Sequence, residues 1–197
     1  MRIALLLLAL CACAEGEDHA PARSADAAIA RPVDAGVTCG INARTLLTGS
    51  GIGKLQIGAS ADGVRTACTV VGDSTEMDAE GNPARVLRVD VGRDTLVAEV
   101  DSGRVWRMAV DRRSFVTSDS LGVGTTLGRL LQISDVSGLE GEGGLFVVSP
   151  SHCGLSFRLH HDVAERQHRG KWTLSDLRTL PPSTPVDQVL LVGCEKA

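Results

Sequence analysis

The chain has 197 residues and a formal net charge of −4, and only 3% of its residues are aromatic. A mildly acidic chain without a basic stripe is a poor partner for nucleic acids, and so few aromatic rings make base or sugar stacking a poor fit. The length allows one domain with its own hydrophobic core.

The first 14 residues have the pattern of an export signal. Arg2 precedes an apolar run that extends to Leu10, and small residues follow. This is the order of charge, apolar core and small residues that a signal peptide shows. The run is shorter than the roughly 20 residues that a membrane-spanning helix needs. We therefore expect export, with residues 1–13 as the signal peptide.

The end of this signal offers two cleavage sites. Leu10-Cys11-Ala12-Cys13 resembles the bacterial lipobox, which implies diacylation of Cys13 and stable tethering to a membrane. In Gram-negative lipoproteins an Asp after the lipidated Cys marks retention in the inner membrane, so Ala14 implies the outer membrane. The alternative is ordinary cleavage after Ala14, which would leave a periplasmic protein.

Residues 14–37 are rich in Ala, Pro and charge and lack apolar periodicity, so they predict a disordered tether. Residues 38–197 then form one domain. Four cysteines lie in it, and an even number in an exported chain predicts two disulfides. Three connectivities are possible, and chain position favours Cys39–Cys68 and Cys153–Cys194. Their spacing contains no C-x2-C pair, which argues against a zinc site.

The domain is organised around residues 51–68. Lys54–Ile57 alternates as a short strand does, Gly58 permits a turn, and Ser60 is placed to cap a short helix that Cys68 ends. A looser copy of this pattern runs from Ser120 to Leu131, with Thr125 as the expected cap.

Residues 85–110 predict an antiparallel meander with one buried face. Apolar residues alternate in three successive strands, and Asp101–Arg104 forms the tight turn between the last two. Trp106 falls in phase with Met108 and Val110, so we expect it in the core. Phe115–Thr117 could add a fourth strand.

The C-terminal part mixes strands with polar segments. We expect a Gly- and acid-rich loop over 132–143 and strands at 145–148, 155–159 and 186–192. The strands at 155–159 and 186–192 must be neighbours if Cys153 and Cys194 are bonded. Residues 160–170 read as a polar excursion, and Trp172 reads as an exposed aromatic. The fold class is α+β: an antiparallel meander with a few short helices.

The segment Ile57–Val64 resembles the opening motif of small bacterial envelope lipoproteins of the SmpA/OmlA type, although Ala59 replaces the usual Met. It is also similar to the tandem α+β units of β-lactamase inhibitory proteins. The resemblance covers about a dozen residues in each copy. It implies an envelope protein with a divergent duplication of one α+β unit, and no activity.

No segment carries a persuasive catalytic or metal-binding set. Gly49–Gly53 lacks the hydroxyl residue of a P-loop. His160, His161 and His168 lie in a cationic segment that opposes metal binding, so we expect a solvated loop. Ser151 beside His152 would need a third partner and defined geometry to act as a nucleophile.

The sequence therefore predicts a non-catalytic, exported domain, lipid-anchored at Cys13, that binds a protein or another envelope component without a cofactor or metal. The alternative is an exported hydrolase or metal-dependent enzyme that uses the region 149–170.

Overall fold

The computed structural model describes residues 39–42, 44–77, 81–92, 94–141, 144–160 and 171–194. The chain divides after Val33, and all of these residues belong to its second unit, Asp34–Ala197. The expected lipidation site Cys13, the tether, His161 and His168 lie outside the described residues.

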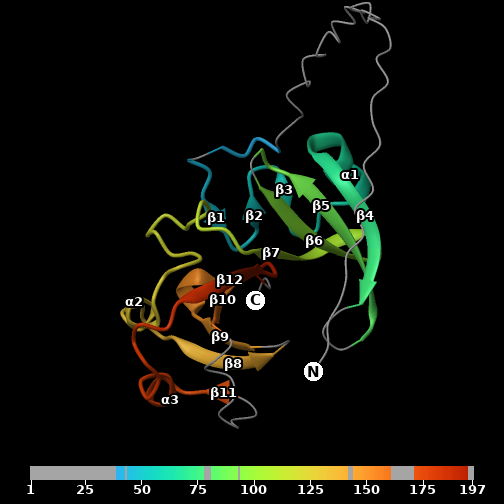
Figure 1. The fold of residues 1–197 in the computed structure, drawn as a ribbon. Coiled ribbons are helices and arrows are strands. Elements are labelled where there is room, and N and C mark those ends of the chain that lie inside the picture. The colour runs from blue at the N-terminus through green and yellow to red at the C-terminus, as the bar shows by residue number, and fades with distance from the viewer. Residues whose placement is uncertain are drawn as a thin grey trace, which may run out of the picture. The chain divides into compact units, whose positions relative to one another are not determined.

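Nine described strands form one sheet in which every pairing is antiparallel, in the order β11-β8-β9-β10-β12-β7-β6-β5-β4 (Figure 1). Its first half is β4 (Thr69–Met77), β5 (Pro83–Asp90), β6 (Thr95–Asp101) and β7 (Arg104–Val110). Its second half is β8 (Ser137–Gly141), β9 (Gly144–Val148), β10 (Leu155–Leu159) and β12 (Val186–Leu191), with β11 (Lys171–Trp172) added at the edge. The α+β class and the meander are confirmed.

Shorter elements complete the domain. A three-stranded sheet precedes the first half and consists of β1 (Leu47–Thr48), β2 (Gly51–Ile52) and β3 (Leu55–Gln56). The helices are α1 (Ala61–Ala67), α2 (Leu127–Leu130), α3 (Leu174–Leu177) and the short 3-10 turn η1 (Pro150–His152).

Each half starts with one helix and contains four neighbouring strands, to which the second half adds β11. The two halves begin with the same backbone hydrogen bonds. The amide of Gly58 donates to the carbonyl of Val105 on β7 at 2.7 Å, and the amide of Gly124 donates to the carbonyl of Val186 on β12 at 2.8 Å. Both glycines have a positive φ. The last strands of the two halves, β7 and β12, pair at the centre of the sheet. The motif at 51–68 and its looser copy thus occupy equivalent places.

The core lies on one face of the sheet, which we call the core face. It is built from the alternating apolar residues that the sequence predicts, among them Leu87, Leu96 and Met108 in the first half and Phe157 and Val189 in the second. We call the opposite side of the sheet the outer face.

Both predicted disulfides are present. Cys39–Cys68 joins the start of the domain to the residue that caps the C-terminus of α1, with a Cα–Cα distance of 4.4 Å. Cys153–Cys194 has a Cα–Cα distance of 5.3 Å, and β10 and β12 pair beside it as expected. The first bridge is buried and the second is exposed.

The prediction for Trp106 is wrong. Its side chain is 41% exposed, while Val105 beside it is 1% exposed. The pairing of β6 with β7 shifts between Glu99 and Val100, so that Trp106 is an extra residue in β7 without a direct partner. A bulge of this kind inverts the alternation on its strand, and the phase read from Met108 and Val110 does not extend past it.

The prediction for Trp172 is wrong in the opposite sense, because this residue is 3% exposed. Trp172 pairs with Gly138 on β8. A Cβ built at Gly138 would lie 2.6 Å from the Cβ of Trp172, so a side chain at position 138 would collide with Trp172. The indole Nε1 donates to Glu140 Oε1 at 3.2 Å, which satisfies its polar end.

Three further expectations change, and one strand had no expectation. Residues 137–141 of the predicted loop form β8, because their backbone pairs with β9. Phe115–Thr117 makes an isolated bridge from Val116 to Gly122 instead of a strand. Thr126, not Thr125, is the N-terminal cap residue of α2. The longest strand, β4, contains no fully buried residue, so the sequence shows no apolar alternation that would predict it.

Candidate functional site

The outer face of the sheet contains an apolar hollow of about 260 Å³. Strands β7, β8, β9, β10 and β12 contribute to it, so both halves of the sheet take part. Its lining consists of Trp106, Arg107, Leu139, Gly141, Phe146, Ser156, Leu190 and Val192. We call this feature the outer-face hollow.

Large apolar side chains are exposed around this hollow. Trp106, Leu139 and Val192 have 41%, 46% and 43% of their surface accessible, while Phe146 is 5% exposed. Pairing of Leu139 with Phe146 and of Ser156 with Leu190 places these residues on one side of the sheet. A contiguous apolar patch on a soluble domain marks a binding surface more often than isolated exposed residues do.

The charge beside the hollow is neutralised. The Arg107 guanidinium donates through Nε to Glu99 Oε1 at 3.0 Å and through Nη2 to Oε2 at 2.7 Å. The two side chains are only 9% and 14% exposed. The same guanidinium lies 4.6 Å from the centroid of the Trp106 ring, in cation–π contact. The exposed indole is therefore held by a paired, nearly buried arginine, which pre-organises it for contact with a partner.

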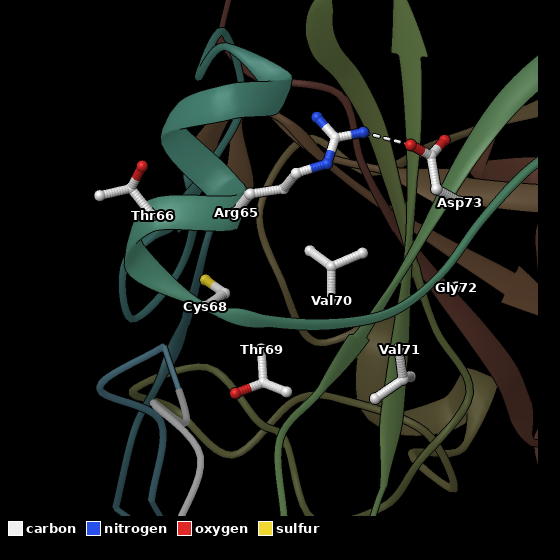
Figure 2. Close-up of a pocket in the computed structure, with 8 residues that line it drawn as sticks. All are labelled: Arg65, Thr66, Cys68, Thr69, Val70, Val71, Gly72 and Asp73. Carbon is white, nitrogen blue, oxygen red and sulfur yellow. Dashed lines mark hydrogen bonds and ion pairs between the residues drawn. The ribbon is translucent and has the colours of Figure 1, made fainter.

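A second hollow, of about 630 Å³, lies between α1 and the start of β4. Figure 2 shows Arg65 extending from α1 toward Asp73 on β4, with which it forms an ion pair. Arg85 on β5 adds two hydrogen bonds to the same carboxylate, each of 3.0 Å. The main charged groups beside this second hollow are therefore paired with one another.

Two acids on β4 are held in their charged form. Hydrogen bonds from Arg85 and Arg65 lower the pKa of Asp73 to about 2. Hydrogen bonds from Arg88 and Ser74 lower the pKa of Glu76 to about 2. An acid that stays ionised throughout the neutral range is unsuited to general acid catalysis, so this group of charges reads as structural.

Ser151 and His152 do acquire a third partner. Ser151 Oγ lies 3.1 Å from His152 Nδ1, and His152 Nε2 lies 3.1 Å from Asp119 Oδ2. Partial burial acts to raise the pKa of Asp119, but hydrogen bonds from Thr117 and His152 outweigh it and the pKa lies below its ordinary value. The residue order Ser, His, Asp is that of a serine triad, but the two ring nitrogens are exchanged, because in a triad Nε2 faces the serine and Nδ1 faces the acid.

Other contacts of this group support a structural role. The Ser149 hydroxyl donates to the Ser134 carbonyl at 3.0 Å and lies 2.9 Å from Ser151 Oγ. The His152 ring packs edge-on against Phe157. These contacts tie the turn before Cys153 to two neighbouring segments. Ser151 is exposed and the Asp119 side chain is 42% exposed, and water weakens the electrostatic contribution that such a group could make to catalysis.

The structure places His160 at the exposed end of β10, with its Nδ1 3.7 Å from Asp187 Oδ2. Among the described residues, no three His, Cys, Asp or Glu side chains gather in a way that could hold a metal ion. Within the same residues, no helix has the length and apolarity needed to cross a membrane.

No protein-family model and no curated protein matches this chain. Its fold is similar to the crystal structure of the uncharacterized protein YfeY from Escherichia coli, with a TM-score of 0.52 and 15% sequence identity. The likeness covers 75% of this chain and 99% of that one. At this level of identity the comparison shows the fold alone.

Sequence reasoning did not find the outer-face hollow. The alternation of β7 predicts Trp106 in the core, and the composition of 132–143 predicts a loop at Leu139. The signal that could have found the hollow is the apolar pair Leu190 and Val192, which lies out of phase with buried Val189 and Leu191. A strand with apolar residues on both faces has a second surface to cover.

Proposed function

We propose that this chain is an exported envelope protein, lipid-anchored at Cys13, whose domain binds another protein without catalysing a reaction. The observation that carries the binding role is the outer-face hollow, with exposed Trp106 held against paired Arg107. Trp and Arg beside a well-packed apolar pocket are the composition of interface hot spots. We infer that the partner inserts an apolar side chain.

Export is supported by the signal pattern and by two disulfides, since structural disulfides persist in oxidising compartments. The lipobox resemblance at Leu10–Cys13 supports the anchor, and Ala14 supports the outer membrane. We expect Cys13→Ser to abolish lipidation and release the protein from membranes. A mature N-terminus at Glu15, found by mass spectrometry, would contradict the anchor.

Site-specific photocrosslinking tests the binding role. Benzoylphenylalanine is introduced in place of Trp106 or Leu139 in the exported full chain, and cells are irradiated. Exposed Gln132, beyond the end of α2, is the matched control position. We expect one shared adduct from positions 106 and 139 and none from 132. Absence of adducts from both hollow positions, or the same adduct from all three, would overturn the proposal.

The hydrogen-bonded set Ser151, His152 and Asp119 favours a second candidate, an exported serine hydrolase. In that case Ser151 would be the nucleophile, His152 its base and Asp119 the group that orients the base. A fluorophosphonate probe applied to the purified chain discriminates the two. We expect no label on Ser151, whereas labelling that Ser151→Ala and Asp119→Asn both abolish would establish the hydrolase.

A further inference from the structure

The two disulfides of this chain differ in how a thiol could reach them. Cys39 and Cys68 are 0% and 4% exposed and belong to the hydrophobic core, so an attacking thiol would have to open part of the domain first. Cys153 and Cys194 are both exposed. Thiol–disulfide exchange begins when a thiolate attacks one sulfur of a bridge, and its rate depends on access to that sulfur. Of the two bridges, the second therefore meets this condition in the folded protein.

The exposed bridge closes a junction that is built from backbone. Gly49, in the turn between β1 and β2, lies against Cys153, since a Cβ built at Gly49 would lie 1.8 Å from the Cys153 carbonyl oxygen. A Cβ built at Gly154 would lie 2.5 Å from the carbonyl oxygen of Gly49 and 2.8 Å from the carbonyl carbon of Gly193. Gly193 also lies beside the Ile57 side chain. The three glycines that meet here bury no side chain of their own, and glycine gains the most conformational freedom when a constraint is removed.

The same junction holds the end of β12. The ladder that β12 forms with β10 and β7 ends at Leu191. Within the described residues 192–194, the amide of Val192 makes one backbone hydrogen bond, to the carbonyl of Gly154 at 2.9 Å. Cys194 is held by the bridge. The bridge and this hydrogen bond therefore connect the end of β12 to the residues just before β10.

This end of β12 forms one wall of the outer-face hollow. Val192 is 43% exposed and lines the hollow together with Leu190 of the same strand. Leu190 pairs with Ser156 and Ala109, so the ladder keeps it in place whether or not the bridge is closed. Val192 lies outside the ladder, two residues before Cys194. Opening the bridge would leave one hydrogen bond to hold this wall, and a single hydrogen bond contributes little to net stability.

We propose that Cys153–Cys194 is an exchangeable bridge that a dithiol protein of the same compartment reduces, and that its opening weakens partner binding at the outer-face hollow. The second part of this proposal rests on the proposed binding function, and the first part does not.

The exchange proceeds in two steps. One thiolate of the reductant attacks the sulfur of Cys153 or Cys194, forms a mixed disulfide and releases the other cysteine as a thiolate, which takes up a proton. The second thiol of the reductant, after losing its proton, displaces the remaining cysteine in the same way. Two electrons and two protons pass from the reductant to the cysteine pair, and the reductant becomes a disulfide.

The rate of reduction tests the bridge itself. The purified full chain is treated with dithiothreitol in mild detergent, and the free thiols are alkylated at successive times and mapped by mass spectrometry. We expect Cys153 and Cys194 to be alkylated about tenfold faster or more than Cys39 and Cys68, because only the second pair is reached without local opening. Equal rates for the two pairs, or faster reduction of the buried pair, would overturn the proposal.

Amide hydrogen exchange measures the effect on the hollow without any partner. The chain reduced at Cys153 and Cys194 is compared with the oxidised chain by nuclear magnetic resonance. We expect the Val192 amide to exchange about fivefold faster or more after reduction. The Leu190 amide, inside the ladder, should exchange at an unchanged rate, which also shows that the domain stays folded. An unchanged rate at Val192 would overturn the coupling between bridge and hollow.

Photocrosslinking from position 106 measures the effect on partner binding in cells. The chain with benzoylphenylalanine in place of Trp106 is compared with the same chain carrying Cys153→Ser and Cys194→Ser, and circular dichroism checks that the latter is folded. We expect the adduct to fall about fivefold or more. An unchanged adduct would overturn the coupling. A parent chain that gives no adduct would contradict the proposed function and with it the coupling, while the rates of reduction would still decide the first part.

Discussion

The two halves of the sheet build the same helix and four strands by different means. The first half is a continuous meander whose neighbours in sequence are neighbours in the sheet, joined by tight turns such as that at Ser102 and Gly103, both with positive φ. The second half inserts the 161–170 segment, β11 and α3 between β10 and β12. Similar architecture therefore rests on local pairing in one half and on distant pairing in the other.

The halves also differ in where they place charge and apolar surface. Near its edge the first half sets arginines opposite acids, as in Arg85 with Asp73 and Arg88 with Glu76. The second half exposes apolar residues on its outer face and, with Trp106 from β7, forms the outer-face hollow. A repeated fold thus carries paired charges near one end of the sheet and an apolar hollow on one face.

The largest expected effect concerns the two disulfides. The bridges enclose similar separations, 29 and 41 residues, so loop entropy alone predicts a loss of about 4 kcal/mol in unfolding free energy for each. Cys39–Cys68 is buried and Cys153–Cys194 is exposed. We expect Cys39→Ala with Cys68→Ala to cost more than the other pair, because it also leaves a cavity.

Chemical denaturation of both double variants measures this difference. Mild dithiothreitol, followed by alkylation and peptide mapping, should in addition open Cys153–Cys194 first, since its sulfur atoms are accessible. Equal losses of unfolding free energy, together with simultaneous reduction of both bridges, would show that burial does not distinguish the two disulfides.

The two tryptophans give the next largest effect. Trp172→Ala removes a ring that is 3% exposed and a hydrogen bond to Glu140, so we expect a loss of about 3–5 kcal/mol. Trp106→Ala removes a ring that is 41% exposed and should change stability by about 0.5 kcal/mol or less. Urea titration monitored by circular dichroism checks both, and a reversed order would contradict the burial described above.

The motif at 51–68 and its looser copy differ in the N-terminal caps of their helices. Ser60 Oγ accepts a hydrogen bond from the Gly63 amide at 3.1 Å, whereas the Thr126 side chain makes no such cap bond to α2. We expect Ser60→Ala to cost about 1 kcal/mol and Thr126→Ala to be close to neutral. Thermal unfolding of the two alanine variants under identical conditions compares them directly, and equal losses would mean that the cap bond is not the cause.

The smallest effect is a pH dependence that belongs to the first half. The pKa of Asp73 is lowered from 3.8 to about 2, so its contribution to stability is present above about pH 4 and is lost as pH falls toward 2. Asp73→Asn should therefore be less stable than the parent at pH 5, with the difference shrinking toward pH 2. Denaturation curves at several acidic pH values test this. A stability difference between the two proteins that stays constant with pH would show that ionisation of Asp73 does not contribute to stability.

Local features of the sequence determined much of this protein. The meander followed from strict alternation, because a side chain points to the same face at every second residue. The cap at Ser60 and the turn at Asp101–Arg104 followed from residue chemistry within a few positions. The two disulfides followed because each cysteine adjoins an element that chain order already placed.

The tertiary structure alone decided the candidate sites. Trp106 is exposed because of one extra residue in β7, and Trp172 packs closely beside Gly138, 34 positions earlier, which has no side chain to collide with it. Asp119 reaches His152 only through the fold, and Leu139 and Trp106 come to one hollow only through the sheet. Each of these depends on pairing between distant segments, and a one-residue change in such pairing reverses which side chains face the core.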